Sequence, residues 1–471
     1  MTASPGNGTL LSATRGLCDV CGALTDAAVV IRDDRVILRK WCLAHGPTEA
    51  LVSSDVGWYL DSLGYVKPPT APRARAVAGY AGCPDSCGLC PAHEQHTCVP
   101  LLEITDACDL DCPICLVGRR GHGHVPVAAV ARMVDELVRC EGAINMLTLS
   151  GGEPTRHPDL LAIVDACRRP EVGIVSLSTN GLALLADDDL TKALRDRGVV
   201  ISLQLDGFTP GTTAALRGRA DLADRKRRLV DRLLTLGARL SLTMTLARGV
   251  NEHEVPAVLD LLLREDAVVS LMVQPLARTH RGLARHAADP MDAITIPDVV
   301  RLLAAGSGGV LERSDFSPLP CSHPSCFALT YLLRTAEGVT PLPRLIERDV
   351  YLDVIKNQAL LNTDVDTLAR IKDALYALWS SSGMVPDRDA VLRTVKQLLV
   401  DLNGLGRGAP HRDVLALGVK RVKSIFIHHF MDRSTFDLAR VVKCCNHYPQ
   451  PDGRLLPACV RNNLAAYRPA E

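Results

Sequence analysis

Three closely spaced cysteines are the residues of this chain best suited to carry out chemistry. Cys108, Cys112 and Cys115 form a C-x3-C-x2-C triplet directly after the apolar run 101–104. Thiolates are the usual ligands of a cubane iron–sulfur cluster, which contains four irons. Because three thiolates on one short loop hold three of these irons, the fourth stays open to a small molecule. The triplet therefore predicts an iron–sulfur cluster that binds a ligand directly.

Strand-like and helix-like segments alternate around this triplet, between residues 101 and 276. Strand candidates are 101–105, 144–149, 173–177, 199–205, 238–245 and 268–273, and helix candidates are 127–140, 159–168, 187–197, 221–237 and 252–264. About six β/α units in succession predict an α/β fold whose parallel sheet curls into a partial (β/α)6 barrel. In such architectures the site lies at the carboxyl ends of the strands.

Polar and small residues gather at these predicted strand ends. In chain order they are Cys108, then Gly151, Gly152, Glu153 and Pro154, then Ser178 and Asn180, then Gln204 and Asp206, then Thr245 and Gln274. Glycines permit positive φ angles and let the backbone approach a ligand closely. We therefore expect the strand ends to form one ligand site, with backbone carbonyls of the glycine turn exposed to a ligand.

The triplet followed one β/α unit later by a GGEP turn resembles the radical SAM superfamily, in which the open iron binds S-adenosylmethionine (SAM). The resemblance implies that the reduced cluster cleaves SAM, and that the resulting 5′-deoxyadenosyl radical removes hydrogen from an unactivated carbon. One departure is Ile114, because the superfamily often has an aromatic residue before the third cysteine.

The resemblance also assigns residues to the cofactor. It makes the cluster ligands Cys108, Cys112 and Cys115 the catalytic residues. It places Gly151, Gly152, Glu153 and Pro154 at the SAM methionyl group, Ser178 and Asn180 at its carboxylate or ribose, and Gln204, Asp206 and Gln274 at ribose or substrate. Ser178 and Asn180 have an alternative role as caps of the following helix.

The chain contains 17 cysteines, which otherwise fall into three groups and two single residues. In a chain this long without a recognisable secretion signal at its start, that number indicates metal sites before disulfides. Cys140 and Cys167 lie in predicted helices, where we expect small buried side chains. The groups are Cys18, Cys21 and Cys42 with His45; Cys83, Cys87 and Cys90 with Cys98; and Cys321, Cys326, Cys444, Cys445 and Cys459.

The segment from Cys83 to Cys98 resembles the CPxxCGLCxxHxxHTC pattern of the archaeal tetraether lipid synthase family and its bacterial relatives. The likeness continues through residues 427–437 and the carboxyl-terminal cysteines. It implies three [4Fe-4S] clusters and one mononuclear, rubredoxin-like iron. Cys83, Cys87, Cys90 and Cys98 would hold one auxiliary cluster; Cys321, Cys326, Cys459 and either Cys444 or Cys445 would hold the other.

Histidines accompany these motifs. The resemblance favours a position near the active site for His428, His429 and Asp432, with a buried structural network as the alternative. His93 and His96 are candidates for contacts to the clusters or the substrate, or for surface histidines.

The first cysteine group has the spacing C-x2-C, then C-x2-H, which closes a tetrahedral site. Residues 29–31 and 35–38 between the pairs indicate a small hairpin. Such ribbons usually bind zinc, whereas the resemblance implies iron, so both metals remain open at Cys18, Cys21, Cys42 and His45.

The chain is divided here into four expected parts: a metal-binding ribbon at 1–66, a linker with an iron–sulfur segment at 67–99, the barrel at 100–290 and a helical region with the second auxiliary cluster at 291–471. Helices are expected at 350–361, 368–379 and 387–402. The formal net charge is zero, which does not indicate nucleic acid as a partner. No apolar run reaches the ~18–20 residues that span a bilayer, so a cytoplasmic protein, with peripheral membrane contact as an option, is expected.

Three functions fit these patterns. The first is radical coupling of sp3 carbons on lipid chains, as the resemblance implies. The second is radical methylation or another modification of a small heterocycle such as a pterin, an activity also attributed to this family. The third is a non-enzymatic electron-transfer or metal-sensing protein, which leaves the GGEP turn and the open triplet without purpose. Both enzymatic functions require an electron donor such as ferredoxin or flavodoxin, and a long aliphatic tunnel would favour lipid over a heterocycle.

Overall fold

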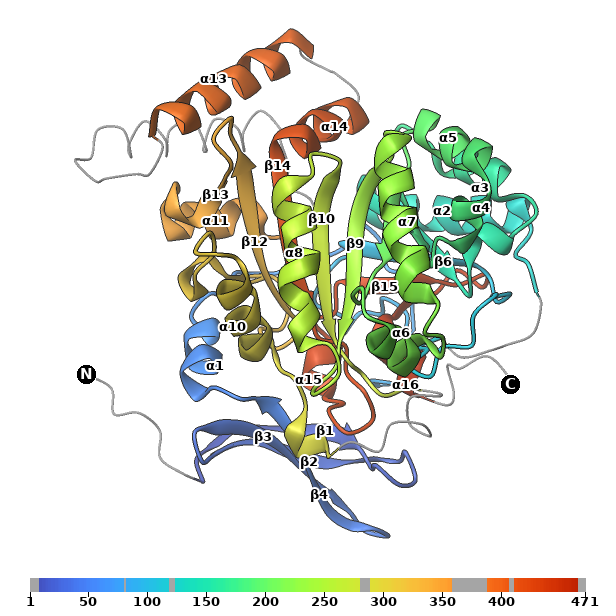
Figure 1. Ribbon diagram of the computed structural model, residues 1–471. Coiled ribbons are helices and arrows are strands. Elements are labelled where there is room, and N and C mark those ends of the chain that lie inside the picture. Colours follow the sequence, from blue (N-terminus) through green and yellow to red (C-terminus); the bar gives the residue numbers. More distant parts are fainter. Residues whose placement is uncertain are drawn as a thin grey trace.

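The computed structural model describes residues 8–79, 82–117, 123–279, 289–357, 388–405 and 411–464. Its centre is a parallel sheet whose strands follow one another in chain order, as the sequence predicts (Figure 1). The strands are β5 (Val99–Thr105), β6 (Ile144–Gly151), β7 (Val172–Thr179), β8 (Val200–Gln204), β9 (Arg239–Leu246) and β10 (Val268–Pro275). The fold is therefore the expected partial radical SAM barrel.

Strand β9 shows how the sequence directs the two faces of this sheet. Leu240, Leu242 and Met244 are fully buried against the surrounding helices. The alternate residues, Thr243 and Thr245 among them, line a cavity inside the barrel. Because successive side chains of a strand point to opposite faces, the outer face forms the core and the inner face forms the site.

The helices that connect these strands cover the outer face. Helix α2 presents Val130, Val134 and Leu137 to the core at the i, i+4 and i+7 spacing of an amphipathic helix. The predicted helix 187–197 is present as α5, and two helices were not predicted, α4 and α6. The bounds are α2 (Val127–Glu141), α3 (Leu160–Cys167), α4 (Leu182–Ala186), α5 (Asp188–Asp196), α6 (Pro210–Arg217), α7 (Leu222–Thr235) and α8 (Val255–Arg264).

Strands from the carboxyl-terminal third extend the sheet at both edges. Strand β14 pairs in parallel with β10, and β12 pairs antiparallel with β14. At the other edge β15 pairs in parallel with β5. The strands are β11 (Ser317–Pro318), β12 (Phe327–Arg334), β13 (Val339–Pro341), β14 (Val422–His428), β15 (Asn446–Pro449) and β16 (Leu455–Pro457).

Helices accompany these strands, as expected for residues 291–471. They are α10 (Ile296–Gly306), α11 (Arg348–Ile355), α13 (Arg388–Leu405), α14 (His411–Arg421), α15 (Leu438–Val441) and α16 (Ala458–Asn463). Leu415 of α14 packs on Ile174 and Val200, near the points where β7 and β8 begin. Figure 1 shows α14 at the end of the sheet opposite β1–β4. The predicted helix 368–379 lies outside the described residues, and the four-part division stays a prediction.

A separate antiparallel sheet lies beside the carboxyl ends of the barrel strands (Figure 1). Lys40 of this sheet is buried, and its ammonium donates to Asp19 and to the Ser434 carbonyl, which ties the sheet to the barrel region. It contains β1 (Leu10–Leu17), β2 (Leu24–Arg32), β3 (Arg35–Cys42) and β4 (Gly46–Ser53), followed by α1 (Val56–Leu63). Among the described residues, no helix combines the length and apolar character needed to cross a membrane.

Candidate active site

The cysteine triplet lies on the loop after β5 and lines a cavity of about 320 Å³ inside the barrel. Burial raises the pKa of the Cys108 thiol to about 11, so bound cationic iron would be needed to hold it as a thiolate. Asp106 also lines this cavity, and its Oδ1 is buried without a hydrogen-bond partner among the described residues. Three convergent thiols beside an unpartnered acceptor fit a cluster that carries a ligand with N–H donors.

The GGEP turn holds the cysteine loop by its backbone. The Gly152 amide donates to the Thr105 carbonyl at 2.7 Å, and the Glu153 amide donates to the Ala107 carbonyl at 2.8 Å. Gly151 has a φ of 130°, and a Cβ there would lie 2.1 Å from the Thr105 oxygen. The glycines are therefore required for close approach to the neighbouring backbone, whereas the sequence indicated close approach to a ligand.

Gly152→Ala is expected to disturb the cysteine loop, because its Cβ would lie 2.4 Å from the Ala107 oxygen. Such overpacking against backbone costs about 1–3 kcal/mol. We expect a lower melting temperature and weaker SAM binding by calorimetry. Gly211→Ala is the matched control, because a Cβ there meets no atom within 4 Å. Equal SAM affinity in the two variants would contradict this role of the turn.

Glu153 organises the next strand end. Its carboxylate accepts hydrogen bonds from the Thr179 hydroxyl at 2.6 Å, the Asn180 amide at 2.7 Å and the Thr155 hydroxyl at 2.7 Å. The Asn180 side chain donates to Asp109, inside the cysteine loop, at 2.6 Å. Glu153 and Asn180 thus join the ends of β6 and β7 to the cluster loop, while Pro154 begins a short 3-10 turn behind them.

Arg217 is a central residue that the sequence did not reveal. Its guanidinium makes a bidentate pair with Asp206, at 2.6 and 2.8 Å, and donates to Thr245 at 3.1 Å. It also hydrogen-bonds the Cys112 thiol and lowers its pKa, against a larger rise from burial. Asp206, which was predicted to contact ribose or substrate, is therefore paired with Arg217 and does not line the cavity. The Arg217 side chain lines it.

Lys226 is a second unpredicted cation. It is 2% exposed and donates to the Asn180 carbonyl at 2.6 Å and to the carbonyl of Gln204. Burial lowers its pKa to about 8. An arginine or lysine on an amphipathic helix normally indicates a solvated face, and only the packing of α6 and α7 onto the strand ends turns these two inward.

The inner face of the barrel is rich in hydroxyl and amide groups. Of the predicted strand-end residues, all but Pro154 and Asp206 line the cavity. Those with hydroxyl or amide side chains are Ser178, Asn180, Gln204, Thr245 and Gln274. Some of these hydroxyls pair with one another, as Ser202 does with Thr243 at 3.2 Å. Aliphatic residues line the far end of the cavity, where the strands begin: Met146, Ile174, Val200, Val269 and Val419.

The nine cysteines of the two predicted auxiliary-cluster groups lie in three sets of three, an arrangement that differs from their order in the sequence. Cys98 does not join its sequence neighbours: its thiol hydrogen-bonds to the thiols of Cys321 and Cys445. This occurs because β15 pairs with β5 and brings the Cys445 carbonyl within 2.8 Å of the Cys98 amide. The sets are Cys83, Cys87 and Cys90; Cys98, Cys321 and Cys445; and Cys326, Cys444 and Cys459.

Aromatic side chains separate the main cavity from the set that contains Cys326. His428 stacks on Phe327 and Phe430 with centroid distances of 3.9 and 3.8 Å. Phe327 and His428 line both the main cavity and a smaller one that the three thiols of this set face. His429 faces only the smaller cavity, and Asp432 caps the turn to Thr435. The structure thus places His428 at the wall of the site.

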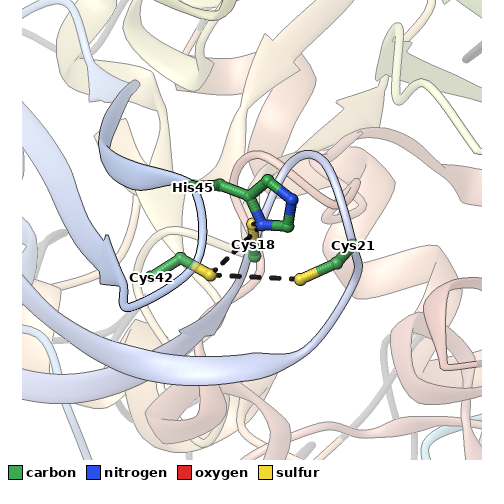
Figure 2. Close-up of side chains that lie close together, drawn as sticks. All are labelled: Cys18, Cys21, Cys42 and His45. Atoms are coloured by element: carbon green, nitrogen blue, oxygen red, sulfur yellow. Dashed lines mark hydrogen bonds between the residues drawn. The ribbon is translucent and has the colours of Figure 1, made fainter.

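The first cysteine group converges at one end of the antiparallel sheet. Figure 2 shows Cys18, Cys21, Cys42 and His45 facing one another across two loops. His45 Nδ1 lies 3.6 Å from the Cys18 sulfur and 3.5 Å from the Cys42 sulfur. All four ligand atoms lie within 4.8 Å of one another, which fits a single tetrahedral metal ion.

Two segments of the chain match known families. Residues 102–262 match the radical SAM superfamily, and residues 10–54 match the HMPTM N-terminal zinc ribbon domain. The second match favours zinc over iron at the four-ligand site.

Cys21→Ala is expected to remove about one equivalent of zinc per chain, because a structural zinc site needs all four ligands. Metal analysis of the purified protein measures this loss. Leu43→Ala is the control, because Leu43 is a fully exposed residue of the same loop. Iron as the metal lost from Cys21→Ala would contradict the zinc assignment.

Characterised proteins resemble the chain over different lengths. The 7,8-dihydro-6-hydroxymethylpterin dimethyltransferase of Methanocaldococcus jannaschii is 27% identical over 96% of this chain and 93% of its own length. The PqqA peptide cyclase of a Methylobacterium species is 32% identical over 35% of this chain and 43% of its own length. The crystal structure of Streptococcus suis SuiB with precursor peptide SuiA superposes with a TM-score of 0.38 and 16% identity, over 46% of each chain.

The barrel, the convergent cysteine triplet and the family match agree with one another. The chain carries a radical SAM domain behind an N-terminal zinc ribbon, and it is a radical SAM enzyme.

Proposed function

We propose that this enzyme methylates a small planar heterocycle of the pterin class. The observation that carries the proposal is the similarity to the archaeal pterin dimethyltransferase, which runs through 96% of the chain and includes the zinc ribbon. The similarity to the peptide cyclase covers only about a third of the chain. Lipid coupling, which the sequence analysis placed first, therefore becomes the second candidate.

The size of the cavity supports a compact substrate. A cavity of about 320 Å³ lies at the lower end of the range of about 300–1,000 Å³ for small-molecule sites. SAM would occupy the part beside the cysteine loop. The remaining space suits a bicyclic ring better than two long alkyl chains.

Asn446 offers a polar group for such a ring. It is 3% exposed, it lines the cavity, and its Oδ1 has no hydrogen-bond partner among the described residues. A buried acceptor without a partner costs about 1–3 kcal/mol. A ring N–H of the substrate would remove this cost, whereas an alkyl chain would not.

The residues of the strand ends have separate tasks in this proposal. Arg217 holds Cys112 and Asp206 in place, and Glu153 fixes the turn that carries the cysteine loop. When bound, the cluster with SAM supplies a carbon radical by one-electron cleavage of a C–S bond. Holding the target carbon close and keeping water out is then the task of the cavity walls. A ferredoxin or flavodoxin would supply the electron, and a second SAM molecule, acting as the one-carbon donor, would supply the methyl group.

Lipid coupling retains one supporting observation. Along β6 the cavity wall runs from Met146 to Gly151, which is about 17 Å at about 3.3 Å per residue. Its far end is aliphatic, as an alkyl chain would require. The hydroxyl groups in the middle of the barrel favour the heterocycle.

One experiment separates the two candidates. Anaerobically reconstituted protein is incubated with SAM and a reductant, and with either 7,8-dihydro-6-hydroxymethylpterin or a total lipid extract. We expect 5′-deoxyadenosine formation to rise with the pterin, together with a product heavier by one or two methyl groups. A rise only with lipid, with species lighter by two hydrogens per joined pair, would overturn the proposal in favour of coupling.

Asn446→Leu is expected to raise the KM for the pterin by about 3- to 10-fold, the worth of one hydrogen bond of about 0.5–1.5 kcal/mol. The KM for SAM serves as the internal control and should not change. A variant with an unchanged pterin KM would remove Asn446 from the substrate site.

A further inference from the structure

Three thiols from distant parts of the chain meet beside the active cavity. Cys98 precedes β5, Cys321 lies between β11 and β12, and Cys445 precedes β15. We call these three residues the Cys98 set. They are 5%, 2% and 0% exposed, and Cys98 itself lines the main cavity. Three buried thiols that lie together indicate a metal centre. Because such centres usually have four protein ligands, a fourth ligand is still to be identified.

His96 lies beside this set and is oriented by a carboxylate. Its Nδ1 is 3.2 Å from Glu141 Oε2, and its Nε2 is 3.6 Å from the Cys98 sulfur. The other oxygen of Glu141 accepts from the Thr97 amide at 2.9 Å, and the side chain is only 2% exposed. The carboxylate therefore accepts a hydrogen bond from the Nδ1–H, which leaves the Nε2 lone pair directed at the Cys98 sulfur. Metal-binding histidines show this arrangement.

His93, the other histidine of this segment, does not direct its Nε2 at the Cys98 set. His93 Nε2 is 2.7 Å from the Cys444 carbonyl oxygen, to which it must donate, and 3.2 Å from His447 Nε2. Its ring is therefore held by protein groups alone. The comparison distinguishes His96 as the histidine whose Nε2 faces the Cys98 set.

Amide groups surround the sulfurs of the set. The Asn357 backbone amide donates to the Cys321 sulfur at 3.0 Å, from a left-handed conformation with a φ of 62°. The Gln95 side chain donates to the Cys98 sulfur at 3.5 Å and to the Asn357 side chain at 2.9 Å. Hydrogen bonds to the ligand sulfurs are one of the means by which proteins set the potential of an iron–sulfur cluster.

The spacing of the ligand atoms favours a cluster over one ion. Within the described part of the chain, the zinc ribbon ligands are the one set of three or more potential ligand atoms that all lie within 4.8 Å. The Cys98 set with His96 is more widely spread. A [4Fe-4S] cluster takes each protein ligand on a different iron and therefore needs the wider spacing.

We propose that Cys98, Cys321, Cys445 and His96 hold one [4Fe-4S] cluster, with the imidazole in place of a fourth cysteine. The cluster would lie at the wall of the active cavity. A neutral imidazole brings no negative charge and donates less electron density to iron than a thiolate does. It therefore stabilises the oxidised cluster less, so the reduction potential is higher than with four cysteines, as in other clusters with histidine ligands. The assignment does not depend on which substrate the enzyme takes.

The test uses the full chain with Cys112→Ala, which removes the SAM cluster and simplifies the spectra. The protein is reconstituted anaerobically, reduced and frozen, and nitrogen couplings are measured by pulsed EPR with and without ¹⁵N-histidine. We expect a strongly coupled nitrogen that responds to the label and is lost in His96→Cys. The His96→Cys protein should keep its iron and have a lower potential, whereas His96→Ala should lose about four irons per chain.

His253→Gln is the control, because His253 is 61% exposed on its side chain and lies on a separate turn. It should retain both the coupling and the iron. A coupled nitrogen that persists in His96→Cys would overturn the proposal. So would His96→Ala protein with unchanged iron, or the loss of a single metal ion in place of about four.

Discussion

Cys112→Ala is expected to abolish the reductive cleavage of SAM. Loss of a group that only orients a metal ligand costs about 10- to 100-fold, so loss of a ligand itself should cost more than about 100-fold. The Cys112 side chain also receives the Arg217 hydrogen bond, which no alanine replaces. The measurement is 5′-deoxyadenosine formed per minute by anaerobically reconstituted protein.

Cys167→Ala is the matched control for this variant. Cys167 is fully buried in α3, away from the cavity lining, and removal of its sulfur should cost about 1 kcal/mol of stability. The control should cleave SAM at the parent rate. Cleavage that survives in Cys112→Ala would remove the triplet from the active cluster.

Arg217→Met is expected to reduce both stability and SAM cleavage. The substitution leaves Asp206 buried without its bidentate partner, and breaking such a pair costs about 3–5 kcal/mol. The free energy of unfolding, measured in urea on metal-free protein, should fall by this amount. SAM cleavage by the reconstituted variant should fall as well, because Cys112 loses its donor.

Arg219→Met tests whether the effect belongs to the buried pair. Arg219 pairs with Asp221 at the surface, where an ion pair contributes little. Its unfolding transition should coincide with that of the parent. An equal loss of unfolding free energy in the two variants would show that the buried Arg217–Asp206 pair stabilises the fold no more than a surface ion pair does.

Much of the barrel could be predicted from the sequence because its signals are local. Strands β5–β10 and helices α2, α3, α7 and α8 each show an apolar pattern with a clear period and a polar end. The cysteine triplet and the GGEP turn are also local motifs. Their position at the strand ends follows from the parallel order of the sheet alone.

The strands of the last third were missed for a physical reason. In β14 (Val422–His428) every residue is buried, so the alternation that indicates a strand is absent. A short, continuous apolar run of this kind reads equally well as part of a buried helix. Residues 291–471 were predicted to be helical because helical patterns occur elsewhere in this region, and the structure retains two of these helices as α11 and α13.

The spatial arrangement of the cysteines could not be read from their order in the sequence. Cys98 is close in sequence to Cys90, yet it contacts Cys321 and Cys445. The strand pairing that unites them joins segments more than three hundred residues apart. Arg217 was missed for a similar reason, because its role depends on how α6 places it beside Asp206, which follows β8.

The convergence of Cys98, Cys321 and Cys445 also has a consequence for how this protein matures. A metal centre bound by all three would cross-link both edges of the sheet, closing chain segments of more than one hundred residues. Clips that close long segments restrict the unfolded chain most strongly. Iron supply in the cell would then govern proteolytic survival as well as activity: iron-starved chains should be nicked first in the last third, while the barrel core persists.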